Sequence, residues 1–196
     1  MTDRILLRVP RPRTDEPDDS TERLDLCRPT AGDVPGLHAI LSDPRVWDHY
    51  PTLRHIEPRQ TQAAVERWLM SWDAVGLGTW VAREHGSEAI VGYGGCSIVN
   101  DIVWNLGYRF ALSAQGRGLA TELSRLAMTR AVQRDRELPI VAYLLEHNLA
   151  SAAVATKLGM TLVDRYPDAG NPDLTAIRLV FADRPLTPAQ LAATRH

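Results

Sequence analysis

The feature that most constrains this chain is a glycine-bearing turn, Gln115-Gly116-Arg117-Gly118-Leu119-Ala120, which lies between a strand pattern and a helix pattern. The preceding segment, 102–112, alternates apolar and polar side chains, as is typical of a strand with one buried face. The following segment, to about Arg134, repeats apolar residues at helical spacing. A strand, a tight turn and a helix in this order indicate an α/β domain.

The residues of this turn suit an anionic ligand. Glycine allows close approach of the backbone, and a helix N-terminus presents N–H groups in a favourable field. We expect the turn to bind a diphosphate through backbone amides, with charge added by Arg117; the residues are Gln115, Gly116, Arg117, Gly118, Leu119 and Ala120. The alternative is a plain turn whose glycines relieve strain. The sequence matches neither a P-loop nor a Rossmann fingerprint.

The other segments predict a mixed, mostly antiparallel sheet of six or seven strands flanked by about four helices. The strands from 79 to 112 are expected to form an antiparallel meander, and only the unit 102–145 suits a parallel pair. Strands are predicted at 24–27, 79–83, 90–98, 102–112, 138–145, 161–166 and 174–182, and helices at 33–43, 59–74, 119–134 and 150–158.

The length of 196 residues indicates one domain with one core. We predict a loose, proline-punctuated arm at 1–20, a single domain at 21–182 and a loosely held tail at 183–196. The net charge of −2 argues against a nucleic-acid or anionic-membrane surface. No apolar run approaches the roughly 20 residues that span a bilayer, and no signal-peptide core is found, so we expect a cytoplasmic protein.

The cysteines and histidines carry no metal or disulfide pattern. Cys27 and Cys96 are far apart and belong to no CxxC motif, and the histidines lack metal-binding spacing. We therefore expect two reduced cysteines and no metal ion.

Three segments, in order, resemble the GNAT acetyltransferase superfamily. The run 107–112 followed by Gln115-x-x-Gly118-x-Ala120 is similar to its motif A, Q/R-x-x-G-x-G/A. Asn148-x-x-Ser151 followed by Lys157-Leu158-Gly159-Met160 looks like a second family motif. The opening segments 21–24, 28–29 and 42–44 are similar to the branch that acetylates ribosomal-protein N-termini, the RimJ/RimL-like branch. The resemblance covers residues 21–182.

This resemblance implies the GNAT fold, with acetyl-CoA as the cofactor. Phe110, Ala111 and Leu112 would pair through their main chain with the pantetheine arm, in a splay between strands 102–112 and 138–145. Asn148 would contact the arm or an ordered water, and Ser151 would hydrogen-bond the departing thiolate. Asn148 and Ser151 also have a purely structural interpretation, as a helix N-cap and its N3 partner.

Two positions depart from the family pattern. Asn105 stands where relatives often carry a glutamate base, and asparagine orients a water without accepting a proton at neutral pH. Ala155 stands where many relatives carry a tyrosine acid, which leaves Ser151 as the thiolate donor. Glu146 and His147 are the nearest base candidates in the sequence, and the alternative is that both are solvated loop residues.

The resemblance implies direct attack of a primary amine on acetyl-CoA, and the acceptor is either a protein N-terminus or a small amine. We expect an acceptor site built from 33–43, 44–58 and 166–173, whose polar side chains include His49, Tyr50, Asp168 and Asp173. The partner is this amine, with no nucleic acid or membrane, and the chain is a monomer or a homodimer. One alternative is a non-catalytic acyl-CoA-binding sensor, and a second is another kind of nucleotide-binding domain.

Overall fold

The computed structural model describes residues 16–169 and 171–195. Within these ranges the strands are β1 (Asp19–Ser20), β2 (Leu24–Cys27), β3 (Thr79–Glu84), β4 (Ile90–Val99), β5 (Val103–Phe110), β6 (Ile140–Leu145), β7 (Thr161–Pro167) and β8 (Ile177–Ala182). The helices are α1 (Val34–Leu41), α2 (Pro58–Val75), α3 (Leu119–Arg134), α4 (Leu149–Lys157) and α5 (Pro188–Ala193). Single 3₁₀ turns lie at Ala31–Asp33, Pro44–Val46, Pro51–Leu53 and Leu112–Ala114.

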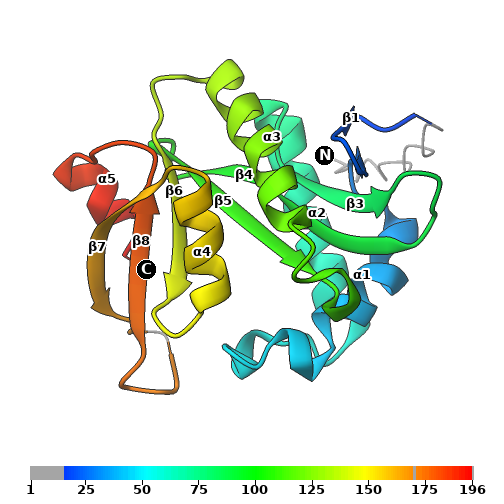
Figure 1. Ribbon diagram of the computed structural model, residues 1–196, viewed down its shortest axis with the longest axis horizontal. Helices are drawn as coiled ribbons and strands as arrows, with labels where there is room; N and C mark the ends of the chain where they lie inside the picture. Colours follow the sequence, from blue (N-terminus) through cyan, green and yellow to red (C-terminus); the bar gives the residue numbers. More distant parts are fainter. Residues whose placement is uncertain (1–15, 170, 196) are drawn as a thin grey trace, which may run out of the picture.

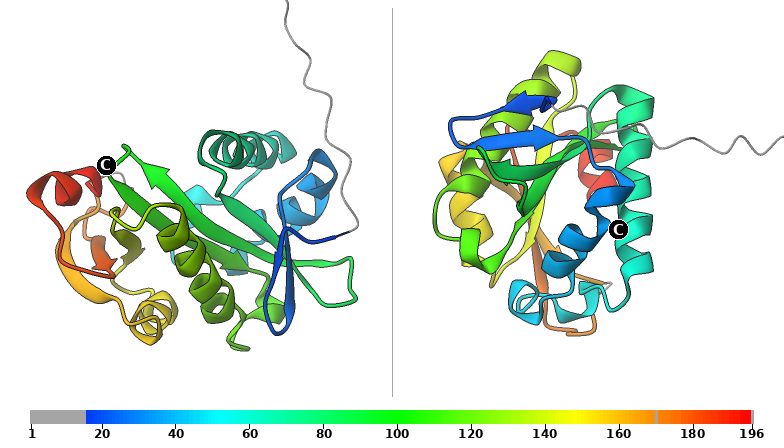
Figure 2. Two further views of the ribbon diagram at one scale, coloured as in Figure 1. Left: turned by 90° about the horizontal axis from the view of Figure 1, so that it is seen from above. Right: turned by 90° about the vertical axis from the view of Figure 1, so that its right-hand side faces the viewer.

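The strands of the described residues form one eight-stranded sheet in the order β1-β2-β3-β4-β5-β6-β8-β7. Every neighbouring pair is antiparallel except β5 and β6, which are parallel. The meander of β3, β4 and β5 and the parallel unit β5–α3–β6 are therefore confirmed. Figure 1 shows α3 and α4 in front of the sheet, and Figure 2 shows α1 and α2 on the opposite side.

Apolar side chains fill both faces of the sheet. The larger cluster lies under α3 and α4 and includes Trp80 and Trp104, which are almost fully buried. On the other face, Leu37 of α1 and Val65 of α2 pack on Val81 of β3. Burial of this apolar surface is the main favourable term in folding. It also makes the sheet a rigid support for the loops at its edges.

The parallel pair of β5 and β6 is short, and this creates the main irregularity of the sheet. Register pairs join only Trp104 to Ile140 and Asn105 to Val141. Beyond them, β5 continues to pair with β4 and β6 with β8, so the two strands separate toward their carboxyl ends. The predicted splay between these strands is thus present.

Several details differ from the sequence prediction. The sheet has eight strands within the described residues, more than the six or seven expected, because Asp19–Ser20 in the predicted arm forms β1. Asp19 is held there by Arg130 of α3, through contacts of 2.5 and 3.0 Å that sequence patterning does not show. Residues 1–15, the rest of the predicted arm, lie outside the described residues.

The predicted tail is also more ordered than expected. Residues 188–193 form α5, so the described part of the chain has five helices instead of about four. Thr187 caps α5, Ala193 and Thr194 are buried, and the Tyr166 hydroxyl of β7 donates to the Thr194 carbonyl oxygen. A second difference is that β5 ends at Phe110, two residues before the predicted end. In the described residues, no helix is both long and apolar enough to cross a membrane.

Candidate active site

The glycine-bearing turn adopts a conformation that requires its glycines. Gly116 and Gly118 have φ values of 74° and 81°, in the left-handed region that favours glycine. Gly118 is the N-cap of α3, which begins at Leu119. The first helical turn leaves the N–H groups of Leu119 and Ala120 without intrahelical acceptors. These donors and the positive end of the helix dipole converge at one point, which is a favourable place for a phosphate.

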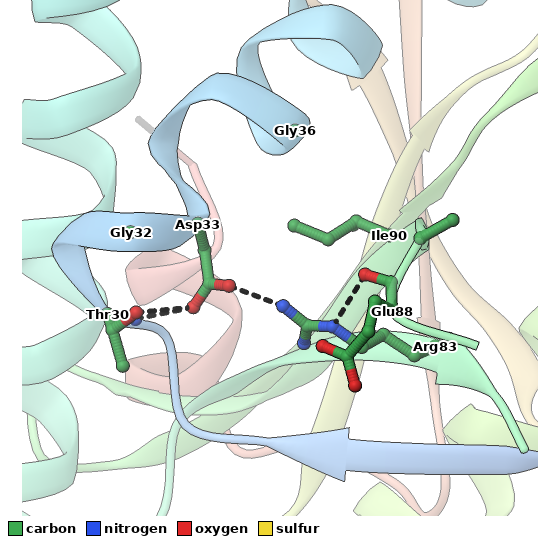
Figure 3. Close-up of a pocket in the computed structure, with 8 residues that line it drawn as sticks. Thr30, Gly32, Asp33, Gly36, Arg83, Glu88 and Ile90 are labelled. Carbon is green, nitrogen blue, oxygen red and sulfur yellow. Dashed lines mark hydrogen bonds and ion pairs between the residues drawn. The ribbon is translucent and has the colours of Figure 1, made fainter. Parts of the chain in front are cut away.

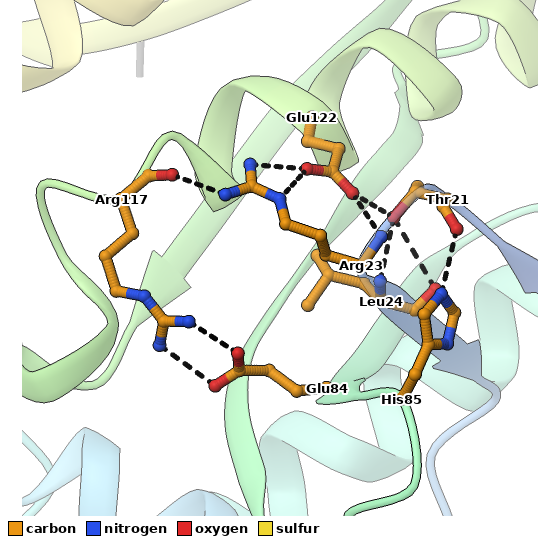
Figure 4. A network of polar contacts seen from close by, with 7 residues as sticks. All are labelled: Thr21, Arg23, Leu24, Glu84, His85, Arg117 and Glu122. Carbon is orange, nitrogen blue, oxygen red and sulfur yellow. Dashed lines mark hydrogen bonds and ion pairs between the residues drawn. The ribbon is translucent and has the colours of Figure 1, made fainter.

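A polar network holds this turn against the segment between β1 and β2 (Figure 4). The Glu122 carboxylate of α3 accepts from the Thr21 hydroxyl at 2.5 Å, the Arg23 backbone N–H at 2.9 Å and Arg23 Nε at 2.7 Å. Arg23 in turn donates through Nη1 to the Arg117 carbonyl oxygen at 2.9 Å. Glu122 therefore positions Arg23, and Arg23 fixes the peptide unit that precedes Gly118.

Two side chains of the turn are already engaged. Arg117 pairs with both carboxylate oxygens of Glu84 on β3, at 2.9 and 2.5 Å, so its charge is already balanced by a carboxylate. Gln115 donates through Nε2 to the Phe110 carbonyl oxygen at 3.1 Å. Arg117 can add charge to the anion site, as the sequence predicts, only if its side chain leaves Glu84. Gln115 has a structural role at the end of β5.

The splay exposes main-chain groups of β5. The Trp104 N–H donates to the Pro139 carbonyl oxygen, which shows that this edge of β5 faces β6. Because peptide groups alternate along a strand, those of Leu106, Tyr108 and Phe110 face the same way. Ala111 does not join them: its N–H donates to the Val91 carbonyl oxygen at 2.9 Å.

The sequence predicts that Ala111 pairs with pantetheine, and in the structure its N–H is already bonded to Val91. The chain leaves the strand after Phe110, and Ala111 precedes the 3₁₀ turn that begins at Leu112. A pantetheine arm in the splay would therefore meet the strand at Tyr108 and Phe110, with Leu112 at its end.

The start of α4 faces the same splay. Asn148 is the N-cap of α4, and its Oδ1 accepts from the Ser151 N–H at 3.0 Å. The Ser151 hydroxyl lies beside the phenol of Tyr108, a residue of β5 that the sequence prediction did not single out. Burial raises the pKa of Tyr108, although the neighbouring Ser151 hydroxyl opposes the shift, so the phenol stays protonated at neutral pH. A hydroxyl pair of this kind can donate to a thiolate.

The opposite face of β5 carries Asn105, Gly107 and Arg109, as the alternation predicts. Although β5 is an interior strand, Gly107 is exposed, and a Cβ built on it would meet no atom within 4 Å. The middle of the sheet is therefore open to solvent at this point. The Asn105 Oδ1 atom beside it is buried and has no hydrogen-bond donor among the described residues. Such an unsatisfied acceptor is costly and suits a bound N–H group or a water.

Arg109 is fixed by the loop between α1 and α2. Its guanidinium lies 3.4 Å from the centroid of the Trp47 ring, and Nη1 donates to the Val46 carbonyl oxygen at 2.9 Å. The Nε2 atom of His49 is 3.5 Å from the same nitrogen. Burial, followed by the Arg109 charge, lowers the pKa of His49, so the imidazole is neutral at pH 7.

The two base candidates that follow β6 lie apart from Asn105. Glu146 forms an exposed ion pair with Arg165, at 2.7 and 3.0 Å, and its pKa is lowered mainly by this hydrogen bonding. The Nε2 atom of His147 lies 3.0 Å from the His49 carbonyl oxygen. Glu146 is thus a solvated surface residue, whereas His147 supports the loop that carries His49.

The remaining acceptor candidates differ in burial. Asp168 is buried and pairs with Arg178 of β8 at 2.6 Å. Tyr50 lies beside this pair, and its pKa is raised by burial and then by the Asp168 charge. Asp173 is exposed and accepts from the Thr175 backbone N–H and hydroxyl, so it stabilises the β7–β8 loop. The structure therefore brings Tyr50 and Asp168 together and places Asp173 outside this group.

A separate hollow lies between β3 and the start of α1 (Figure 3). Its floor is a buried ion pair between Arg83 and Asp33, and Arg83 Nε also donates to the Glu88 carbonyl oxygen at 3.2 Å. Asp33 occupies the N-cap position of α1, but its carboxylate makes no capping hydrogen bond to that helix. It accepts from the Thr30 N–H and hydroxyl, one 3₁₀ turn earlier. The hollow is lined by two carboxylates, those of Asp33 and Glu88, and by one guanidinium, that of Arg83. None of its lining residues belongs to the splay between β5 and β6.

Among the residues that the prediction did not single out, Tyr108 and Arg109 are the most informative. Both lie in the run 107–112 that carries the family resemblance, and the strand alternation places them on opposite faces. The sequence does contain a signal for the role of Arg109, because an arginine is unexpected in a strand that is otherwise rich in aromatic residues. Nothing in the sequence links Tyr108 to Ser151, because their contact joins two elements that are far apart in the chain.

Comparison with known proteins identifies the class to which this fold and site belong. Residues 23–161 match the family model described as an acetyltransferase (GNAT) domain. The chain is a member of the GNAT acetyltransferase family, which confirms the resemblance predicted from its motifs.

Individual relatives support this placement. The uncharacterized protein YkkB of Bacillus subtilis (strain 168) is 29% identical over 126 residues, which cover 62% of this chain and 71% of YkkB. A crystal structure of an acetyltransferase from Agrobacterium tumefaciens str. C58 superposes with a TM-score of 0.69 at 25% identity, covering 88% of this chain and 96% of that one. RimL, a ribosomal L7/L12 α-N-protein acetyltransferase in complex with coenzyme A, gives a TM-score of 0.70 at 19% identity, covering 84% and 95%.

Proposed function

We propose that this protein transfers the acetyl group of acetyl-CoA to a primary amine by direct attack. The observation that carries the proposal is the adjacency of two binding features. The turn at Gly116 and Gly118 presents amides at a helix N-terminus, and the splay between β5 and β6 opens directly beside it. A diphosphate followed by an extended amide-bearing arm fits this combination, and RimL, which shares the fold, is known in complex with coenzyme A.

In this proposal, the amides of residues 116–120 bind the diphosphate, and the peptide groups of Tyr108 and Phe110 pair with the pantetheine arm. Gln115 holds the end of β5 by its bond to the Phe110 carbonyl oxygen. Acetyl-CoA supplies an activated acyl group. The protein therefore has to position the amine, accept the proton that the amine loses and provide a proton donor to the departing thiolate.

The acceptor amine enters at the open space over Gly107. Asn105 Oδ1, which lacks a donor among the described residues, accepts an N–H of the amine or of an intervening water. Asn105 cannot take the proton. The neutral imidazole of His49, which lies beside Arg109 on the same side of the sheet, accepts it through intervening water, which gives this chain a base on the acceptor side in place of the family glutamate.

The departing thiolate receives its hydrogen bond from Ser151, which Tyr108 supports through its protonated phenol. This pair takes the place of the tyrosine that many relatives carry at the position of Ala155. Asn148 contributes by fixing the first turn of α4 and with it the position of Ser151.

The test is release of free coenzyme A from acetyl-CoA in the presence of a panel of peptide N-termini, amino acids, polyamines and aminoglycosides. Wild type should release the thiol only with an acceptor, and Gly118→Asp, which places a carboxylate at the anion site, should release none. A chain that binds acetyl-CoA yet acetylates nothing in the panel would be the non-catalytic sensor.

A further inference from the structure

Arg109 is a partly buried cation that has no carboxylate partner among the described residues. Its identified contacts are the Val46 carbonyl oxygen, the Trp47 ring, the His49 imidazole and the Tyr93 hydroxyl. Burial lowers the pKa of Arg109, which reflects the cost of keeping its charge there. The Trp47 ring offsets part of this cost by a cation–π contact.

The contrast with Arg178 makes this arrangement informative. Arg178 lies on the same side of the sheet, in a neighbouring part of the acceptor face, and Asp168 pairs with it at 2.6 Å. Arg109 has five N–H donors in a planar fork, a geometry that matches a carboxylate. Nothing anionic among the described residues fills that fork.

The local potential around Arg109 is positive. The pKa of His49 is lowered by burial, then by Arg109, and in smaller part by His147, while Asp48 raises it. The pKa of His55 is lowered by burial, then by His38, Arg67 and Arg109. The charge of Asp48 raises the pKa of Arg109, but the Asp48 side chain is 82% exposed. The surroundings of Arg109 therefore favour an anion over a second cation.

The spacing along β5 sets the size of the acceptor. Asn105 and Arg109 are four residues apart on one strand face, which separates their Cα atoms by about 13 Å. Gly107 lies between them, and the space above it is open. In a single amino acid the amine and the carboxylate are attached to the same carbon, so they lie too close together to reach both side chains. An extended peptide reaches both.

On these grounds, and resting on the proposed acetyl transfer, we infer that the acceptor is a peptide N-terminus with an acidic side chain near its second or third residue. Asn105 Oδ1 receives the amine, and Arg109 binds the carboxylate. The same arrangement disfavours polyamines and aminoglycosides, which carry several positive charges.

The test compares matched tripeptide amides that differ only in glutamate or glutamine at the second or third position, with spermidine and kanamycin as polycationic acceptors. We expect kcat/KM to be about tenfold or more higher for the glutamate peptide at the better position, as for a charge-assisted hydrogen bond. Arg109→Gln should abolish this ratio and Arg109→Lys should retain part of it. Arg59→Gln, which removes an arginine with an 82% exposed side chain at the start of α2, should leave it unchanged.

Three outcomes of this comparison would overturn the inference. They are equal kcat/KM for the glutamate and glutamine peptides, a polycation as the best acceptor, or a ratio that survives in Arg109→Gln. If Arg109→Gln fails to fold, the wild-type ratio should still decrease as salt is raised from about 0.05 to 0.5 M, because salt screens charge pairs. A salt-independent ratio would also overturn the inference. Acetylation of none of the amines would instead refute the proposed function itself.

Discussion

Glu122 offers the sharpest test of how the anion-binding turn is held. Its carboxylate accepts three hydrogen bonds from Thr21 and Arg23 and forms an ion pair with Arg23 Nη2 at 2.5 Å. The Glu122 side chain is 16% exposed, whereas Arg23 is 42% exposed, so solvent screens part of the interaction. Hydrogen bonds to a charged group contribute about 1.5–3 kcal/mol, and after this discount we expect Glu122→Gln to cost about 1–2 kcal/mol. For a chain of this size, that corresponds to a midpoint lower by about 2–8 °C.

The pH dependence of this cost follows from the direction of the pKa shift. Burial raises the pKa of Glu122, but the hydrogen bonds from Thr21 and Arg23 outweigh it, so the folded pKa lies below the ordinary value of 4.5. The stabilisation is thus complete above that value and is lost as pH falls through the lower, folded pKa. The difference in melting temperature between wild type and Glu122→Gln should be constant from pH 7 to pH 6 and should shrink below about pH 4.

Thermal melts between pH 3 and pH 7 measure this difference, with Glu137→Gln as the control, because Glu137 has an 87% exposed side chain and a weak contact of 3.9 Å with Arg136. Glu122→Gln should also weaken acetyl-CoA binding, because Arg23 would no longer be held against the Arg117 carbonyl oxygen. A variant that melts with wild type, or a difference that persists at pH 3, would refute the assigned role of this network.

Three further predictions concern the chemistry and the acceptor. Tyr108→Phe should lower kcat with little change in the KM for acetyl-CoA, because the phenol supports Ser151 without binding the cofactor; an unchanged kcat would remove Tyr108 from the proposal. The pKa of His49 is lowered, so kcat/KM of wild type should fall below about pH 6.5 as the imidazole becomes protonated. His49→Gln should lose that inflection along with most of the rate, and a retained inflection would identify another base. Gly107→Leu should fold normally, since its Cβ meets no atom within 4 Å, and should raise the acceptor KM at least about tenfold; an unchanged KM would place the acceptor elsewhere.

The sequence predicted those parts of the fold that depend on local patterns. Alternation along β5 placed Asn105, Gly107 and Arg109 on one face, and the glycines at 116 and 118 indicated a tight turn, in which both glycines have positive φ values. Gly159 likewise ends α4 with a φ of 79°. These features depend on a few adjacent residues, so pattern and propensity suffice to find them.

Features that depend on contacts between distant segments were missed. The β1 strand is held by Asp19 and Arg130, and α5 is held through Tyr166, pairs separated by 111 residues and 28 residues. In both cases the polar sequence of the segment predicts a loose arm or tail, because the residue that stabilises the segment lies in a distant part of the chain. The roles of Tyr108 and Arg109 were missed for the same reason. Helix α4, which contacts Tyr108, and the loop between α1 and α2, which contacts Arg109, approach β5 only in the folded chain.

The most direct test of the central claim is the thermal stability of wild type and Gly118→Asp with acetyl-CoA, coenzyme A, ATP and NAD. A ligand at 100 times its dissociation constant stabilises the folded state by about 2.7 kcal/mol. In a chain of this length that raises the midpoint by about 5–10 °C. We expect this shift for wild type with acetyl-CoA and coenzyme A, and none for the variant, because Gly118 at φ 81° forms the N-cap of the anion-binding helix. A well-folded wild type that shifts with ATP or NAD but not with acetyl-CoA would contradict the account.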